Sequence, residues 1–177
     1  MLPLGTRAPA FTLKDVVSGH QIKLEDSEHQ ATVIMFICNH CPYVKHINSA
    51  LTQLANDYQN QGVRFIAINS NDVENYPDDS PENMKKTAEV NHYPFPYLFD
   101  DTQEVAKAYQ AACTPDFYVF NQNMRLEYRG QLDESRPGNN IPVTGDSLRQ
   151  ALDSLLQNKP VNPNQKPSLG CNIKWKH

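Results

Sequence analysis

The hydrophobic residues of the chain follow three patterns, and each predicts a different kind of element. Short alternating stretches at 11–13 and 22–24 flank a turn-like segment, which predicts an N-terminal β-hairpin with one buried face. The run from Ala31 to Ile37 is apolar and rich in β-branched residues, as in a parallel strand covered on both faces. From Pro42, apolar residues recur every three or four positions and predict an amphipathic helix that ends near Gly62.

The rest of the chain predicts a sheet with strands in both directions. Val63–Ile68 is a second buried strand, and it completes a βαβ unit with a right-handed crossover. Ser80 before a proline predicts a helix start. Further elements are expected as a helix to about residue 90, a brief strand at 97–99, a helix at 103–110, a hairpin at 117–120 and 125–129, and a last helix at 145–157. The hairpin makes the sheet mixed.

The length of 177 residues fits one domain, which we place at residues 1–158. A C-terminal tail, residues 159–177, follows it. The tail contains three prolines, yet its end carries Leu169, Cys171, Ile173 and Trp175, which is too apolar for a mere linker. We therefore expect the end of the tail to dock on the domain.

Composition and charge narrow the class of protein. The 16 basic and 20 acidic residues give a net charge of −4, which argues against general nucleic-acid binding. A mean hydropathy of −0.62 and the lack of a long apolar stretch predict no membrane span. The start lacks a signal-peptide pattern, so we expect a cytoplasmic protein. The acidic stretch 72–82 lacks calcium-loop spacing and is interpreted as a solvated loop.

The four cysteines are too sparse for a disulfide framework, which leaves catalytic, metal-binding or buried roles. Cys38-Asn39-His40-Cys41 stands where the first buried strand passes into a helix. There the first cysteine is expected to meet unpaired N–H groups and the positive helix end, which favour a thiolate; a protonated His40 would favour it further. Cys41, one turn on, lies within reach to resolve a mixed disulfide.

Four segments carry a family resemblance: residues 9–13 (PAFTL), 36–44 (FICNHCPYV), 113–117 (CTPDF) and 168–175 (SLGCNIKW). With them the chain resembles the thioredoxin superfamily, in its redoxin branch of alkyl-hydroperoxide-reductase-like and disulfide-reductase-like proteins, over nearly the whole length. The resemblance is to the bacterial peroxiredoxin-like group with a CxxC motif. It implies an α/β thioredoxin-like fold, a mixed central sheet flanked by helices, with an N-terminal β-hairpin extension and an insertion after the second core strand, at about 69–90.

The resemblance also implies roles for residues. Cys38 would be the attacking thiol and Cys41 the resolving thiol. Pro115 would be a cis-proline beside them, and Thr114 would offer backbone groups to an extended substrate segment.

The chain departs from the family patterns at three points. Asn-His replaces the Gly-Pro of thioredoxin between the cysteines, which leaves the redox direction open. Ile34 and Cys38 stand where peroxiredoxins have their motif proline and threonine, when the motifs are aligned on Cys41. No carboxylate lies in residues 31–37, so proton handling is expected to fall to His40 or water.

Two further cysteines are open to two readings each. Cys113 precedes the Thr-Pro pair and is either an additional redox thiol or a small buried hydrophobe. Cys171 is either a second resolving thiol or a tail cysteine packed beside Trp175.

We interpret the chain as a thiol–disulfide oxidoreductase without an organic cofactor or metal. Expected partners are a disulfide-containing protein or small molecule and an external dithiol donor, with the chain a monomer or homodimer and no nucleic acid or membrane involved. One alternative is a thiol-dependent peroxidase with antioxidant activity, using Cys38 or Cys41 with Cys113 or Cys171. An alternative of another class is a zinc or copper(I) binding or delivery protein, with Cys38, His40, Cys41 and Cys113 as ligands.

Overall fold

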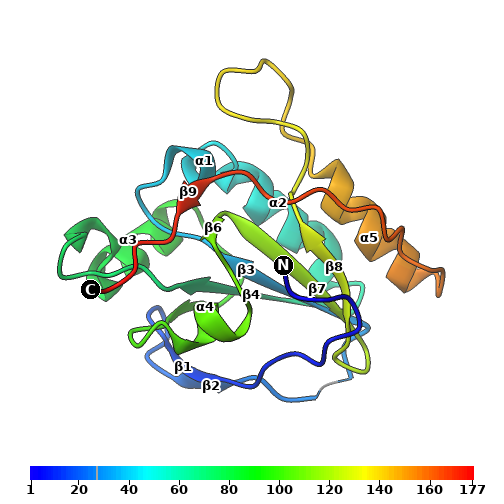
Figure 1. Ribbon diagram of the computed structural model, residues 1–177, viewed down its shortest axis with the longest axis horizontal. Coiled ribbons are helices and arrows are strands. Elements are labelled where there is room, and N and C mark those ends of the chain that lie inside the picture. The colour runs from blue at the N-terminus through cyan, green and yellow to red at the C-terminus, as the bar shows by residue number, and fades with distance from the viewer. Residues whose placement is uncertain (27) are drawn as a thin grey trace.

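The computed structural model describes residues 1–26 and 28–177, and a mixed sheet forms its centre. The strands follow the order β2-β1-β5-β4-β3-β7-β8 across the sheet, and all of them except β5 are labelled in Figure 1. They are β1 (Thr12–Asp15), β2 (Gln21–Lys23), β3 (Ala31–Phe36), β4 (Val63–Asn69), β5 (Tyr97–Phe99), β7 (Asp116–Asn121) and β8 (Leu126–Gly130). A separate pair joins β6 (Cys113–Thr114) and β9 (Cys171–Asn172). The predicted mixed sheet and N-terminal hairpin are confirmed.

β3 is an interior strand of the sheet, covered on both faces, and every one of its residues is buried. It pairs in parallel with β4, from Ala31 opposite Val63 to Phe36 opposite Ile68. On its other side it pairs antiparallel with β7, where Phe36 faces Asp116. β3 therefore ends beside the start of β7, so Cys38 emerges next to the Thr114–Pro115 segment.

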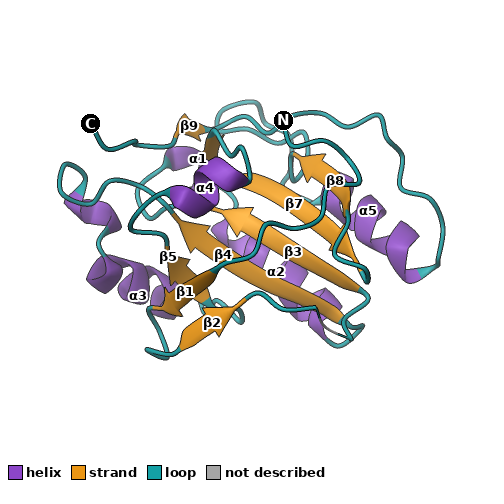
Figure 2. Cartoon of the chain, turned by 60° about the horizontal axis from the view of Figure 1, so that its bottom comes forward, coloured by secondary structure: helices purple, strands orange, loops and turns teal. Residues whose placement is uncertain are grey.

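Helices cover both faces of this sheet (Figure 2). They are α1 (Pro42–Lys45), α2 (Asn48–Gln59), α3 (Pro81–Val90), α4 (Glu104–Ala108) and α5 (Asp146–Leu156), with a 3-10 turn η1 at Pro77–Asp79. Residues of α1, α2, α3 and α5 fill the core on one face. α4, the N-terminal segment and Ile173 of the tail fill the core on the other. None of these helices, within the described part of the chain, is long and apolar enough to cross a bilayer.

The single helix predicted from Pro42 to near Gly62 is wrong in one respect, because the structure divides it into α1 and α2. Ile47 adopts φ −111° and ψ 0° between the two. Val44, Ile47 and Leu51 are all buried, so the apolar spacing continues through the interruption. Hydrophobic periodicity therefore could not reveal the break.

The segment between β4 and β5 contains η1 and α3, as the predicted insertion requires. The Ser80 hydroxyl caps α3 by accepting the Asn83 N–H at 3.2 Å, which confirms the predicted helix start.

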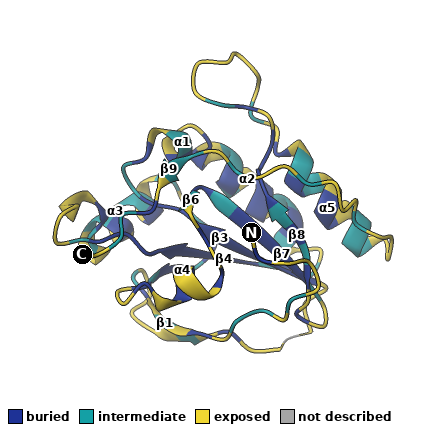
Figure 3. Cartoon of the chain, viewed as in Figure 1, coloured by how far each residue is buried: buried dark blue, intermediate teal, exposed yellow. Residues whose placement is uncertain are grey.

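The tail returns across the molecule after α5, and much of residues 159–170 is exposed (Figure 3). Its end is held more firmly, since Ile173 is buried. Within this end, the strand β9 pairs with β6. A strand of two residues is too short for hydrophobic alternation to predict it.

Candidate active site

The CxxC cysteines lie against the Thr114–Pro115 segment, as the resemblance implied. Cys38 and Cys41 are free thiols, 1% and 0% exposed. The Cys38 sulfur is 3.4 Å from the Thr114 hydroxyl oxygen, and the Cys41 sulfur is 3.5 Å from the Thr114 carbonyl oxygen. The Thr114–Pro115 peptide bond is cis. One short segment therefore contacts both sulfurs.

The helix end lies at the second cysteine, so the expectation that the first cysteine meets it is wrong. α1 begins at Pro42, and Cys41 is its N-cap residue. Proline fits the first helical position because it has no N–H to leave unpaired, and this fixes the helix start one residue after Cys41. The backbone N–H of Val44 donates to the Cys41 carbonyl oxygen at 3.0 Å, and it also helps to lower the pKa of the Cys41 thiol. The positive helix end thus stabilises charge on Cys41.

The thiols share their charge unequally. The neighbouring Cys38 thiol, aided by the Cys171 thiol and the Val44 N–H, lowers the pKa of Cys41 well below that of an ordinary cysteine. The interaction with Cys41, together with burial, raises the pKa of Cys38. In the resting geometry the pair therefore carries its negative charge on Cys41 and its proton on Cys38.

Cys171 belongs to the same cluster, although it lies in the tail. β9 places it opposite Thr114, and its thiol is close enough to the Cys41 sulfur to lower the pKa of Cys41. Burial, together with the interaction with Cys41, raises the pKa of Cys171 to about 11. Cys171 packs against the core on one face of the sheet and Trp175 against the core on the other, so the reading of Cys171 as packed beside Trp175 is wrong.

Cys113 lies close to this cluster but points elsewhere. Its thiol faces the carbonyl oxygens of Pro115 and Ser168, at 3.7 and 3.8 Å. Burial raises the pKa of Cys113 to about 12. The side chain is therefore a protonated thiol near neutral pH, which slows any attack by it.

Asp79 corrects the interpretation of 72–82 as a solvated loop. Its side chain is 0% exposed, and Nδ1 of His40 lies 2.5 Å from its Oδ2 atom. It accepts hydrogen bonds from the Asn39 N–H at 2.7 Å and from the side-chain amides of Asn69 and Asn71 at 3.1 and 3.0 Å. These donors satisfy a carboxylate that burial alone would penalise. The missed signal was the run of asparagines directly after a buried strand.

His40 lies between this carboxylate and the cysteines. Its ring stacks on Tyr76, with centroids 6.2 Å apart and planes 8° apart. Possible ligand atoms of Cys38, His40 and Asp79 all lie within 4.8 Å of one another. The arrangement can hold a proton near the pair, and its sulfur, nitrogen and oxygen donors also suit a metal ion.

A second carboxylate follows the cis bond directly. Asp116 accepts the Phe117 N–H at 3.1 Å and the Tyr118 hydroxyl at 3.2 Å. Burial raises the pKa of Asp116 to about 7. The two carboxylates near the cysteines, buried Asp79 and half-buried Asp116, therefore come from outside residues 31–37, where sequence reasoning looked for one.

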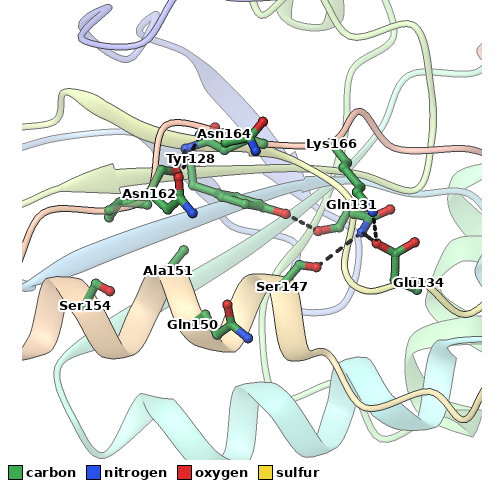
Figure 4. Close-up of a pocket in the computed structure, with 12 residues that line it drawn as sticks. Tyr128, Gln131, Glu134, Ser147, Gln150, Ala151, Ser154, Asn162, Asn164 and Lys166 are labelled. Atoms are coloured by element: carbon green, nitrogen blue, oxygen red, sulfur yellow. Dashed lines mark hydrogen bonds and ion pairs between the residues drawn. The ribbon is translucent and has the colours of Figure 1, made fainter.

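A separate polar pocket of about 190 Å³ lies between α5 and the segment 161–166 (Figure 4). Tyr128, Gln131 and Ser147 are among its lining residues, and the Tyr128 hydroxyl donates to the Gln131 carbonyl oxygen. No cysteine lines this pocket. The pocket is therefore distinct from the thiol cluster.

Comparisons with known proteins agree with this geometry. A crystal structure of an uncharacterized conserved protein from Geobacillus kaustophilus is 64% identical, with a TM-score of 0.97 over 99% of this chain and 94% of that chain. The thiol-disulfide oxidoreductase ResA of Geobacillus thermodenitrificans is 24% identical over 86% of this chain and 78% of its own length.

The fold likeness extends to more distant structures. The thioredoxin domain of a thiol-disulfide oxidoreductase from Bacteroides vulgatus is 18% identical, with a TM-score of 0.65 over 84% of this chain and 97% of that chain. The central sheet and its flanking helices are thus thioredoxin-like. The AhpC/TSA family model matches residues 4–129, most of the sheet and the whole CxxC segment. The chain therefore belongs to the AhpC/TSA family.

Proposed function

We propose that this oxidoreductase exchanges thiols and disulfides through Cys38 and Cys41. The observation that carries the proposal is that both CxxC sulfurs contact Thr114, next to the cis bond. A stabilised thiolate next to a second thiol is what disulfide exchange requires. The name of the ResA relative supports the same chemistry.

The reaction balances with the groups present and one external reagent. A thiolate of the pair attacks one sulfur of a substrate disulfide, forms a mixed disulfide and releases the other substrate sulfur as a thiolate. The second cysteine loses its proton to His40 or water and attacks the mixed disulfide. This step forms the Cys38–Cys41 disulfide and releases the second substrate thiolate. Two electrons have then passed to the substrate, and an external dithiol returns them to the pair.

The order of attack is a separate proposal. From the sequence we expect Cys38 to attack first, and that assignment stays a prediction. The resting charge favours the reverse order, in which Cys41 attacks first and Cys38 resolves. The Asp79 carboxylate supports this order because its negative charge also raises the pKa of Cys38.

The other residues of the site have supporting roles in the proposed reaction. Thr114 positions both sulfurs, and Asp79 fixes the His40 ring. Cys171 contacts Cys41 and is a candidate third redox thiol, whereas Cys113 would react more slowly because it stays protonated. We place the reaction in the cytoplasm, where reducing dithiols that can reset the pair are available.

A redox titration against glutathione tests the proposal. We expect the wild type to form one disulfide in the CxxC pair, Cys38→Ser and Cys41→Ser to lose turnover of hydroxyethyl disulfide, and Cys171→Ser to retain it. Full turnover in either CxxC variant would overturn the assignment. Turnover of hydrogen peroxide with a thioredoxin system, at a higher kcat/KM than for disulfides, would instead favour the peroxidase alternative.

A second candidate function is metal binding, favoured by the three donors that lie within 4.8 Å of one another. Zinc accepts thiolate, imidazole and carboxylate ligands, and three protein ligands leave one position open. Metal analysis of protein purified under reducing conditions tests it. One ion per chain, lost in His40→Ala and kept in His46→Ala, would support this function; a metal-free wild type would contradict it.

A further inference from the structure

The C-terminal tail forms a strand on the edge that leads into the cis bond. β9 runs antiparallel to β6, with Cys171 opposite Thr114. The N–H of Ile173 extends the pairing by donating to the Ala112 carbonyl oxygen at 3.1 Å. Figure 1 shows β9, in red, beside β6 and α1. The edge is therefore already occupied by a segment of the chain itself in an extended conformation.

The register of this strand brings a sulfur to the reactive pair. Cys171 lies opposite Thr114, whose carbonyl oxygen is 3.5 Å from the Cys41 sulfur, so the Cys171 thiol lies near that sulfur and helps to lower its pKa. An extended polypeptide bound in the same register would place its own cysteine at the same point. β9 therefore resembles a bound thiol partner in both backbone and side chain.

Gly170 shows what such a partner must look like. A Cβ atom built on Gly170 would lie 2.0 Å from the Thr114 carbonyl oxygen and 3.1 Å from Cδ of Pro115. The first contact is with backbone, which cannot rotate away as a side chain can. A residue larger than glycine before the cysteine is thus incompatible with this register.

We propose that the β6 edge binds an extended polypeptide partner in which glycine directly precedes the reacting cysteine, and that β9 competes with this partner. The inference rests on the proposed exchange chemistry of the CxxC pair and adds the class of substrate. A tethered competitor acts at millimolar effective concentration, so the partner binds when β9 leaves the edge.

The contacts of the tail allow this release. β9 contributes only two residues to its sheet, and Leu169 beside it is 55% exposed. The anchors lie further on, where Ile173 is buried and the Lys174 N–H donates to Oδ1 of Asn71 at 2.9 Å. A short strand with few buried contacts opens at low free energy, while the body of the fold stays intact.

The test uses the full-length chain and three disulfide probes. The variant Gly170→Ala unseats β9 through the backbone contact, and Leu169→Ala is the matched control on the neighbouring exposed residue. The probes are the peptides Leu-Gly-Cys-Asn-Ile and Leu-Ala-Cys-Asn-Ile, each as a mixed disulfide with glutathione, and hydroxyethyl disulfide. Hydrogen exchange of the Ile173 amide reports whether β9 has left β6.

Two results are expected. Gly170→Ala raises kcat/KM for the glycine peptide about tenfold over the wild type and over Leu169→Ala, with faster exchange at Ile173. Within this variant the glycine peptide reacts about tenfold faster than the alanine peptide, as one overpacked methyl group predicts.

Equal rates for the two peptides, or no gain in Gly170→Ala, would overturn the inference if hydroxyethyl disulfide is turned over. Unchanged protection of the Ile173 amide in Gly170→Ala would overturn it as well. A chain that turns over none of the three probes would instead remove the proposed function.

Discussion

His40 and Asp79 form a close pair, with Nδ1 of His40 2.5 Å from Oδ2 of the buried carboxylate. They come from different segments, the CxxC turn and the 3-10 turn η1 of the insertion. The insertion therefore completes the active site, because its carboxylate holds the turn between the two cysteines through His40 and the Asn39 N–H.

The variant Asp79→Asn tests this connection. An amide in place of the carboxylate turns its NH₂ group toward other donors, either the Asn39 N–H and Asn69 at the Oδ1 position or Asn71 at the Oδ2 position. Buried polar groups are then left unpaired. We expect a loss of about 2–4 kcal/mol in the free energy of unfolding, measured in urea. Asp78→Asn, on the exposed neighbour, should stay within about 0.5 kcal/mol of the wild type. Equal losses in the two variants would contradict the role of Asp79.

Trapping experiments test the order of attack. Because the resting charge lies on Cys41, we expect Cys38→Ser combined with Cys171→Ser to accumulate a mixed disulfide with glutathione on Cys41. Cys41→Ser combined with Cys171→Ser should accumulate little. Peptide mapping by mass spectrometry identifies the modified residue. Accumulation mainly on Cys38 in the second variant would restore the order that the sequence predicted.

A pH titration of thiolate absorbance tests the charge itself. The lowered pKa of Cys41 means that this thiol stays ionised as the pH falls below the usual cysteine range near about 8.5. We expect one thiolate per chain at neutral pH, absent in Cys41→Ser and present in Cys113→Ser. A wild type without thiolate at neutral pH would contradict the assignment.

The stability of the fold should depend on Asp116. Burial raises its pKa to about 7, whereas an unfolded aspartate titrates near about 3.9. Between these values the native state binds a proton that the unfolded state has released, so this group lowers the free energy of unfolding as the pH rises from about 4 to 7.

Asp116→Asn removes this titration and keeps an acceptor oxygen for the Tyr118 hydroxyl. We expect the variant to gain in Tm relative to the wild type at about pH 8 and to gain much less at about pH 5. Thermal unfolding at both pH values measures the difference. A gain of the same size at both would show that the carboxyl does not titrate in this range.

The sequence predicted the parts of the fold that rest on local pattern. β3 is apolar at every position, and the Ser80 cap marks the start of α3, so both elements were found. Thr114 and Pro115 were placed beside the cysteines through the family resemblance. The structure adds that they contact Cys38 and Cys41 through one residue, Thr114.

The parts that sequence reasoning missed depend on contacts between distant segments. β9 has two residues, which is too short for any alternation, and only its pairing with β6 defines it. Asp79 looked like one of several acidic loop residues, because its donors Asn69 and Asn71 become neighbours only in the folded chain. The break at Ile47 left the apolar spacing unchanged. Hydrophobic periodicity does not report such relationships between distant segments.

The position of Cys171 near the end of this sequence matters for handling the protein. An affinity tag fused after His177 would extend a segment in which the Lys176 N–H is still held by Gln103, at 2.9 Å. Thiol measurements are therefore best made on protein whose purification handle lies elsewhere or has been cleaved off.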